Sequence, residues 1–280
     1  MRVETPTTGG GASVAVAAAA RTAEQTSAAR PRRIMFCSQK GGVGKTASAL
    51  NVAATLGSMG CRTLIVDTDP IGSISACFGV TLAPGHPGIY GIEQWALPDL
   101  VVPEVGPGLD LLPYADDRRT IDLNAVHRSL LVLSGRAEGS YDYLIVDTRP
   151  SVADMTRRLC QVVDGVVVVF QCHPLAYRTL GGILGQLRDA RSDGAEARLL
   201  GLLLTMVDTS DPLQVQLEQH IRKSLGQALI RVSIPMDASV GQGLMQDRPA
   251  VLHESGAPAA VAYRELTRYL VEASQPVAAK

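Results

Sequence analysis

A glycine-rich segment with two lysines has the composition of a loop that binds a polyphosphate. It lies between an apolar run and a helical pattern and reads Gln39-Lys40-Gly41-Gly42-Val43-Gly44-Lys45-Thr46. Glycines let the backbone curve so that successive N–H groups face an anion, and the following helix presents its positive end. In this pattern Lys45 reaches the β- and γ-phosphates, and the Thr46 hydroxyl ligates Mg²⁺. The segment therefore predicts a site for a nucleoside triphosphate with magnesium.

Two features of this loop depart from the strict phosphate-loop pattern. Gln39 stands where the pattern has glycine, and an additional lysine, Lys40, precedes the glycine pair. The alternative interpretation is a glycine-rich turn with incidental lysines. The strand–loop–helix context and the carboxylates that follow in the sequence favour phosphate binding.

Three aspartates follow two apolar runs and could complete a magnesium site. Asp67 ends the run 64–66, Asp69 lies two residues further on, and Asp147 ends the run 143–146. An apolar strand followed by aspartate is the Walker B arrangement, in which Asp147 holds Mg²⁺ directly or through water. Asp67 would face the same metal, and Asp69 would face the γ-phosphate and polarise a water. One such aspartate alone is more often a helix cap or turn residue, but two sites beside a phosphate loop favour metal binding.

The elements that would position these residues alternate between strands and helices. Apolar runs predict strands at 34–37, 63–66, 109–112, 143–146, 166–170, 199–205 and 230–234. Helical patterns span 45–59, 123–133, 176–191, 213–225 and 259–273. Several strands are continuously apolar, which is typical of strands covered on both faces. The alternation predicts an α/β fold with a doubly wound, mostly parallel sheet and helices on both faces, as in P-loop NTPases.

Composition bounds the organisation and the classes of function. Residues 1–30 are rich in Ala, Thr, Gly and Ser and are predicted to be a disordered tail, followed by one domain over 31–275 and a short tail over 276–280. The chain is 46% hydrophobic and 19% charged, so it can bury a substantial core. Its net charge of −1 argues against a strongly basic nucleic-acid binder but is compatible with a local basic patch.

Cysteine spacing and the length of the apolar runs indicate the cellular compartment. The five cysteines are scattered, and no pair has C-x-x-C spacing, which is typical of reduced thiols rather than a metal site or disulfide framework. The apolar runs have the length of strands, well short of the ~20 residues of a membrane span. A cytoplasmic protein is expected.

These motifs resemble those of the deviant-Walker ParA/MinD family of P-loop ATPases, and within it the ParA/Soj-like partition ATPases. The resemblance rests on the run from Lys40 to Thr46, on Asn51 in the following helix and on the run from Asp67 to Gly72. It continues in the family's order through 164–172, 204–208 and 234–240, and covers about 32–272. The loop motif is highly specific, and the later motifs are moderately so.

The resemblance implies a dimer that forms face to face when Mg-ATP binds. The lysine that matches Lys40 reaches the partner's nucleotide, a charge supplied in trans that acts as an arginine finger does. Lys45 and Asp69 would complete the catalytic set, with Asp69 placing the attacking water, while Thr46, Asp67 and Asp147 would surround Mg²⁺. The nucleotide contacts it implies are Lys40, Gly41, Gly42, Val43, Gly44, Lys45, Thr46 and Ala47 in the loop, and Met206, Asp208, Pro235, Met236 and Asp237 around the adenine. Hydrolysis would be slow until a ParB-like or other partner protein stimulates it.

The chain departs from the partition members at positions that bear on its cargo. Ile71 and Ser73 replace a glutamine and an asparagine, and Arg149 replaces a proline after Asp147. The stretch 236–243 carries no arginine, which weakens the expected DNA binding because phosphate contacts dominate non-specific affinity. Basic candidates that remain are Arg222, Lys223, Arg231, Arg248, Arg264 and Arg268. The charges of the C-terminal helix balance, so no membrane attachment of the MinD type is expected.

Three functions remain open. The first is a positioning ATPase whose reversible dimer segregates DNA or distributes another cargo in the cytoplasm, with the nucleoid as one place of association. The second is a nucleotide-switched recruitment module, similar to MinD, FlhG or TadZ, that does not bind the nucleoid. The third is a metabolic ligase or metal-delivery enzyme, which is disfavoured because the sequence shows no substrate pocket or metal-ligand motif.

Overall fold

The computed structural model describes residues 30–114, 122–150 and 153–275. The two predicted tails, 1–30 and 276–280, lie outside the described residues apart from Arg30. Within the described ranges, no helix combines the length and apolar character needed to cross a bilayer.

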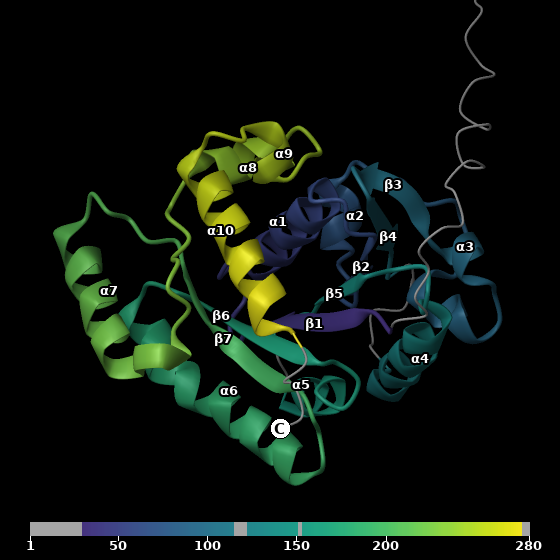
Figure 1. The fold of residues 1–280 in the computed structure, drawn as a ribbon, viewed down its shortest axis with the longest axis horizontal. Helices are drawn as coiled ribbons and strands as arrows, with labels where there is room; N and C mark the ends of the chain where they lie inside the picture. Colours follow the sequence, from purple (N-terminus) through teal and green to yellow (C-terminus); the bar gives the residue numbers. More distant parts are fainter. Residues whose placement is uncertain (1–29, 115–121, 151–152, 276–280) are drawn as a thin grey trace, which may run out of the picture.

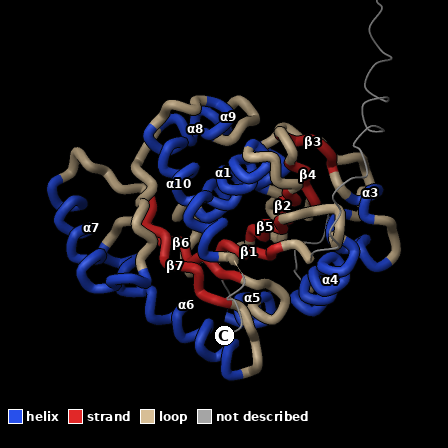
Figure 2. Tube along the Cα trace, viewed as in Figure 1, coloured by secondary structure: helices blue, strands red, loops and turns tan. Residues whose placement is uncertain are grey.

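A seven-stranded sheet lies at the centre of the described part of the chain (Figures 1 and 2), in the order β3-β4-β2-β5-β1-β6-β7. The strands are β1 (Arg32–Cys37), β2 (Thr63–Asp67), β3 (Val102–Gly106), β4 (Leu109–Leu112), β5 (Tyr143–Asp147), β6 (Gly165–Gln171) and β7 (Arg198–Thr205). Every pairing is parallel except that of β3 with β4. The chain winds outward from central β1 first to β2 and β4 and later to β6 and β7. The predicted doubly wound, mostly parallel sheet is confirmed.

Helices cover both faces of the sheet, as Figure 1 shows. They are α1 (Lys45–Ser58), α2 (Ser73–Cys77), α3 (Leu97–Leu100), α4 (Leu123–Arg136), α5 (Ala153–Leu159), α6 (Pro174–Ser192), α7 (Pro212–Leu225), α8 (Ala238–Leu244), α9 (Ala250–His253) and α10 (Pro258–Ala273), with 3₁₀ turns η2 (Gly88–Glu93) and η3 (Gly226–Ala228). Helices α1 and α10 pack on one face. Helices α4, α5 and α6 pack on the other.

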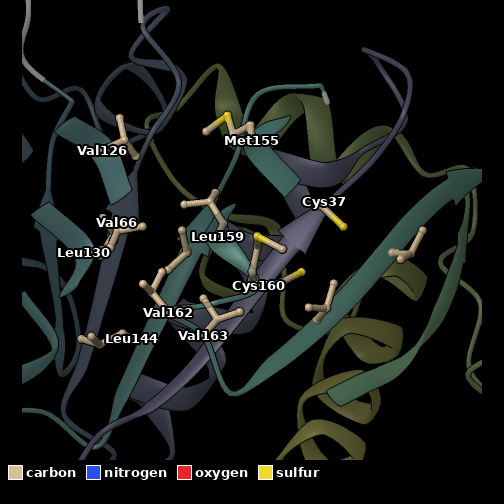
Figure 3. Packing of buried hydrophobic residues seen from close by; sticks show 14 of the residues in the cluster. Cys37, Val66, Val126, Leu130, Leu144, Met155, Leu159, Cys160, Val162 and Val163 are labelled. Carbon is tan, nitrogen blue, oxygen red and sulfur yellow. The ribbon is translucent and has the colours of Figure 1, made fainter. Parts of the chain in front are cut away.

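Two apolar clusters form the core, one on each side of the sheet, because alternate strand residues point to opposite faces. In β1, Ile34 and Phe36 belong to the cluster under α1 and α10, whereas Met35 and Cys37 belong to the other. Figure 3 shows part of the second cluster, with Leu130 and Leu159 of the helices and Val66 of a strand. Burial on both faces explains the continuous apolar runs of the central strands.

The strand predicted over 230–234 is wrong. Only isolated parallel bridges form there, at Leu229 with Leu202 and at Pro235 with Val207. Ile230 donates its N–H to the Leu202 carbonyl and Ile234 donates to that of Leu204, so this segment advances four positions while β7 advances two. The segment therefore bows away from the sheet edge and cannot maintain a regular ladder. It still passes beside the end of β7, where it contributes to the candidate site.

An ion pair between the buried Arg33 and the half-exposed Asp164 ties β1 to the start of β6. The Arg33 side chain is 7% exposed and donates to Asp164 over 3.0 Å and 2.5 Å, and to the Ser134 hydroxyl over 3.0 Å. Burial alone would raise the pKa of Asp164, but the hydrogen bonds from Arg33 outweigh it and hold that pKa below its ordinary value. The pair therefore stabilises the fold when Asp164 is ionised.

We expect Asp164→Asn to lower the free energy of unfolding by about 2 kcal/mol at pH 7, because it weakens the hydrogen bonds of a buried guanidinium. Because folding lowers the pKa of Asp164, its contribution to stability is fully present at pH values above the unfolded-state pKa of about 3.9. The contribution is lost as the pH falls through the pKa of the folded state. Urea denaturation at pH 7 and pH 3 measures both. The control is Glu93→Gln, which disrupts the exposed pair of Glu93 with Arg128 and should cost less than ~0.5 kcal/mol. If Asp164→Asn lowers the free energy of unfolding by as much at pH 3 as at pH 7, the ionised carboxylate of Asp164 is not the source of the stability.

Candidate functional site

The carboxyl ends of β1, β2 and β5 bring the phosphate loop and the aspartates together. Strands β2 and β5 pair in parallel, and the register sets Asp67 directly opposite Asp147. Strand β5 also pairs with β1, whose end leads into the loop at residue 38. Ligands of open α/β sheets bind at this edge. Parallel register alone thus places two carboxylates from residues 80 positions apart beside one loop.

Lys45 and Thr46, the first residues of α1, contact the carboxylate of Asp147. Lys45 Nζ lies 2.7 Å from Asp147 Oδ1, and the Thr46 hydroxyl donates to Oδ2 over 2.8 Å. The side chains of Lys45 and Asp147 are 6% and 0% exposed. Burial raises the pKa of Asp147, and the ammonium of Lys45 opposes that rise. An ammonium, a hydroxyl and a carboxylate are therefore already assembled where the loop enters α1.

Asp67 and Asp69 add two more buried carboxylates. Asp67 accepts the backbone N–H groups of Asp69 and Ile74, over 2.9 Å and 3.2 Å, and Asp69 accepts that of Ile71 over 3.1 Å. Burial and the nearby charge of Asp147 raise the pKa of Asp67 to about 7, although the two backbone donors lower it. Both carboxylates thus shape the loop 68–72 and the start of α2.

The loop backbone has the conformation that its glycines allow. Gly42 and Gly44 have φ of 74° and 80°, in the left-handed region that favours glycine. The stretch from Lys40 to Gly42 is exposed, whereas Val43 and Lys45 are buried. The Ser38 hydroxyl donates to the carbonyl of Lys40 over 2.9 Å. The loop therefore presents exposed backbone on one side and is anchored on the other.

Two anchors of the loop were not predicted from the sequence. The Ser48 hydroxyl donates to the carbonyl of Gly44 over 2.8 Å. The Thr205 hydroxyl, at the end of β7, lies 2.8 Å from the carbonyl oxygen of Val43. Thr205 lies inside a motif of the family resemblance, but its contact depends on the pairing of β6 with β7 and has no local signal in the sequence.

Among the residues expected around an adenine, Met206 lies beside the loop, and the two carboxylates are hydrogen-bonded to their neighbours. Met206 has φ of 56°, and its Cε would lie 3.7 Å from a Cβ placed on Gly44. Asp208 accepts from the backbone and hydroxyl of Ser210. Asp237 accepts from the N–H groups at the starts of α8 and α10.

The backbone of this region is held beside the end of β7. Pro235 bridges to Val207, and the N–H of Met236 donates to the Val207 carbonyl over 2.9 Å. Of the carboxylates in this group, that of Asp237 is engaged in capping helices. Met206 lies near Gly44 of the loop, and the backbone of 235–236 is joined to the adjacent Val207.

The donor set fits a magnesium ion that a nucleotide brings with it. The oxygens of Thr46, Asp67 and Asp147 are hard ligands of the type that Mg²⁺ prefers. One ammonium among three buried carboxylates leaves negative charge that a divalent cation would neutralise. In the described residues, no group of three or more His, Cys, Asp or Glu is arranged to chelate a metal alone. This agrees with Mg²⁺ held by few protein ligands together with phosphates and waters.

Comparisons with known proteins identify the class and then the family. The sheet order, the glycine-rich loop and the strand-end aspartates define a P-loop nucleotide-binding ATPase. The family described as an AAA domain matches residues 31–197. The chromosome-partitioning ATPase Soj of Thermus thermophilus is 34% identical over 242 residues, which are 85% of this chain and 94% of that protein. The chromosome partitioning protein ParA of Caulobacter vibrioides is 27% identical over 90% of this chain and 98% of its own length.

A solved structure shows the same fold. The septum site-determining protein MinD of Pyrococcus horikoshii, complexed with Mg-ADP, superposes with a TM-score of 0.70 at 21% identity, over 88% of this chain and 100% of that one. The chain belongs to the ParA/MinD family of P-loop ATPases.

We expect Lys45→Met to lower the free energy of unfolding of the nucleotide-free protein by ~3 kcal/mol, because it leaves buried carboxylates without their cation. Adding Asp147→Asn should recover at least half of the loss, since it removes the unpaired charge. Urea denaturation at pH 8 without nucleotide measures both variants. If the double variant is no more stable than Lys45→Met, the ion pair does not control stability at this site.

Proposed function

We propose that this chain is a Mg-ATP-dependent ATPase that dimerises when ATP binds and that positions or segregates DNA or another intracellular cargo. The observation that supports this is the convergence of Lys45, Thr46, Asp67 and Asp147 beside the glycine-rich loop. The Soj and ParA relatives, which are chromosome-partitioning proteins by name, support the positioning role. A cytoplasmic protein that associates with the nucleoid through DNA fits this role.

The loop residues would bind the triphosphate. The N–H groups from Gly41 to Ala47 would face the phosphates, and Lys45 would exchange the Asp147 carboxylate for phosphate oxygens. Asp147 and Thr46 would then hold the magnesium ion, with Asp67 behind them. Bound Mg²⁺ neutralises charge on the phosphates. Met206, Asp208 and residues 235–237 would border the base.

Asp69 and Lys40 would carry the chemistry. Asp69 is 7% exposed, lies two residues beyond the end of β2 and would orient the attacking water. Lys40 is exposed on the loop and would reach the nucleotide of a second copy of the chain. A site that needs a charge from its partner hydrolyses slowly as a monomer. A ParB-like or other partner protein that favours the assembled dimer would accelerate turnover.

We expect Lys40→Ala to bind Mg-ATP within about fivefold of the wild-type affinity but to hydrolyse it ~10³-fold more slowly, because comparable charges supplied in trans have effects of this size. Light scattering coupled to size-exclusion chromatography reports dimerisation with ATP, and phosphate release reports turnover. The control is Lys223→Ala, which removes an exposed lysine in the last turn of α7 and should change neither. Wild-type protein that stays monomeric with Mg-ATP would refute the proposal.

The recruitment module without DNA binding is the second candidate, and the arginine contacts favour it. Residues 236–243 hold no arginine. Arg222, one of the basic candidates, contacts Glu218 and Ser233. Arg264 donates to the carbonyl of Ser255. The positive charge left for phosphate contacts is thereby reduced.

We expect the ATP-bound protein to co-sediment with plain duplex DNA at 50 mM salt and to lose most of that binding at 200 mM, because few phosphates are contacted. Combining Lys223→Ala, Arg231→Ala and Arg268→Ala should abolish the binding at 50 mM. The control is Arg157→Ala, since Arg157 is paired with Asp193 beside α5. Strong binding by the wild type at 150 mM salt would exclude the recruitment module, and no binding at 50 mM would exclude DNA as the cargo.

A further inference from the structure

Thr205, the last residue of β7, holds the phosphate loop from behind. It is 1% exposed, and its hydroxyl oxygen lies 2.8 Å from the carbonyl oxygen of Val43 and 3.1 Å from that of Phe170 in β6. A hydroxyl has one hydrogen to donate, so the two carbonyls share it and the shorter contact is to the loop. The next residue, Met206, has φ of 56°, so the strand ends at this contact.

The carbonyl that Thr205 holds belongs to the same peptide unit as the N–H of Gly44. In a planar trans peptide the C=O and N–H bonds point in opposite directions. Because the Val43 carbonyl points inward to Thr205, the Gly44 N–H is directed away from the core, toward the side on which the loop is exposed. Gly44 has φ of 80°, and glycine in this region has few steric limits of its own, so a neighbouring contact must fix the peptide.

Two side chains also lie close to the peptide unit that joins Val43 and Gly44. A Cβ on Gly44 would meet Thr205 Cβ at 3.8 Å and Met206 Cε at 3.7 Å, so these two side chains line the side of the glycine from which a Cβ would project. A buried carbonyl without a donor costs free energy. The orientation in which the Val43 carbonyl meets the Thr205 hydroxyl is therefore strongly preferred over one in which the peptide is rotated.

We propose that Thr205 is a positioning residue for nucleotide binding: its hydroxyl holds the Val43 carbonyl and thereby aims the Gly44 N–H at a phosphate. This inference rests on the proposed Mg-ATP site and adds a residue from the opposite half of the sheet to it. Thr205 acts through the loop backbone and does not touch the nucleotide.

The test replaces the hydroxyl by a methyl group of similar size in Thr205→Val. Equilibrium titration with Mg-ADP, which requires no turnover, gives the dissociation constant. We expect it to rise about fivefold to tenfold, the effect of one lost hydrogen bond. In ATP hydrolysis, KM should rise by a similar factor while kcat stays within twofold, because the loop holds the phosphates equally in the ground and transition states. Thr205→Ser, which keeps the hydroxyl, should bind within twofold of wild type.

The matched control is Thr267→Val in α10. Thr267 is fully buried, and its hydroxyl donates to the Tyr263 carbonyl over 2.8 Å, a bond of the same kind away from the loop. The Thr267→Val variant should bind Mg-ADP with the affinity of wild type, even if urea denaturation shows that it loses as much stability as Thr205→Val. Comparable losses of affinity in both valine variants would show that destabilisation, not loop positioning, is responsible.

Two other results would overturn the inference. One is Thr205→Val binding Mg-ADP within twofold of wild type, and the other is Thr205→Ser binding as weakly as Thr205→Val. Failure of the wild-type protein itself to bind Mg-ADP or Mg-ATP would instead refute the proposed nucleotide site. The outcomes for the site and for Thr205 are therefore distinct.

Discussion

Lys45 and Asp147 form a buried ion pair at the head of α1, and the burial of this charge constrains the elements packed around it. Charges removed from water are tolerated only when partners satisfy them. The Thr46 hydroxyl takes the second oxygen of Asp147, and backbone N–H groups take both oxygens of Asp67. Strands β1, β2 and β5 must end together to supply these groups. The parallel register that pairs Asp67 with Asp147 is thus as much a requirement of the charges as of the apolar core.

Much of this arrangement can be predicted from the sequence because it has local signals. Continuous apolar runs predict buried strands, and an aspartate after two of them lies at the same sheet edge whatever the order of the strands. The helical stretch that begins at Lys45 follows directly from the glycine-rich loop. Sequence could not show that Thr205 reaches Val43, because that contact depends on β6 lying between β1 and β7.

The errors and omissions have equally specific causes. The apolar character of 230–234 favours a strand, but this segment advances four positions while β7 advances two, which no local pattern reports. Short elements such as α8 and β3 lack enough residues for a period to be recognised. Asp237 stays a predicted neighbour of the base, and in the structure its carboxylate accepts the N–H groups of Ser239 and Ala259. A short polar side chain before a helix serves capping as readily as binding.

The helix that follows the loop connects the site to the C-terminal helices through buried polar contacts. Asn51 is 1% exposed, donates to the Ala47 carbonyl and accepts the N–H of Val251 at α9. An apolar residue at this position would leave the Val251 N–H without a partner in the core, which is costly. Helix α1 therefore cannot shift against α9 without breaking a buried hydrogen bond, whereas apolar packing alone would tolerate sliding. Because Ser48 on the same helix holds the Gly44 carbonyl, the phosphate loop, α1 and α9 are joined by directional contacts and not only by burial.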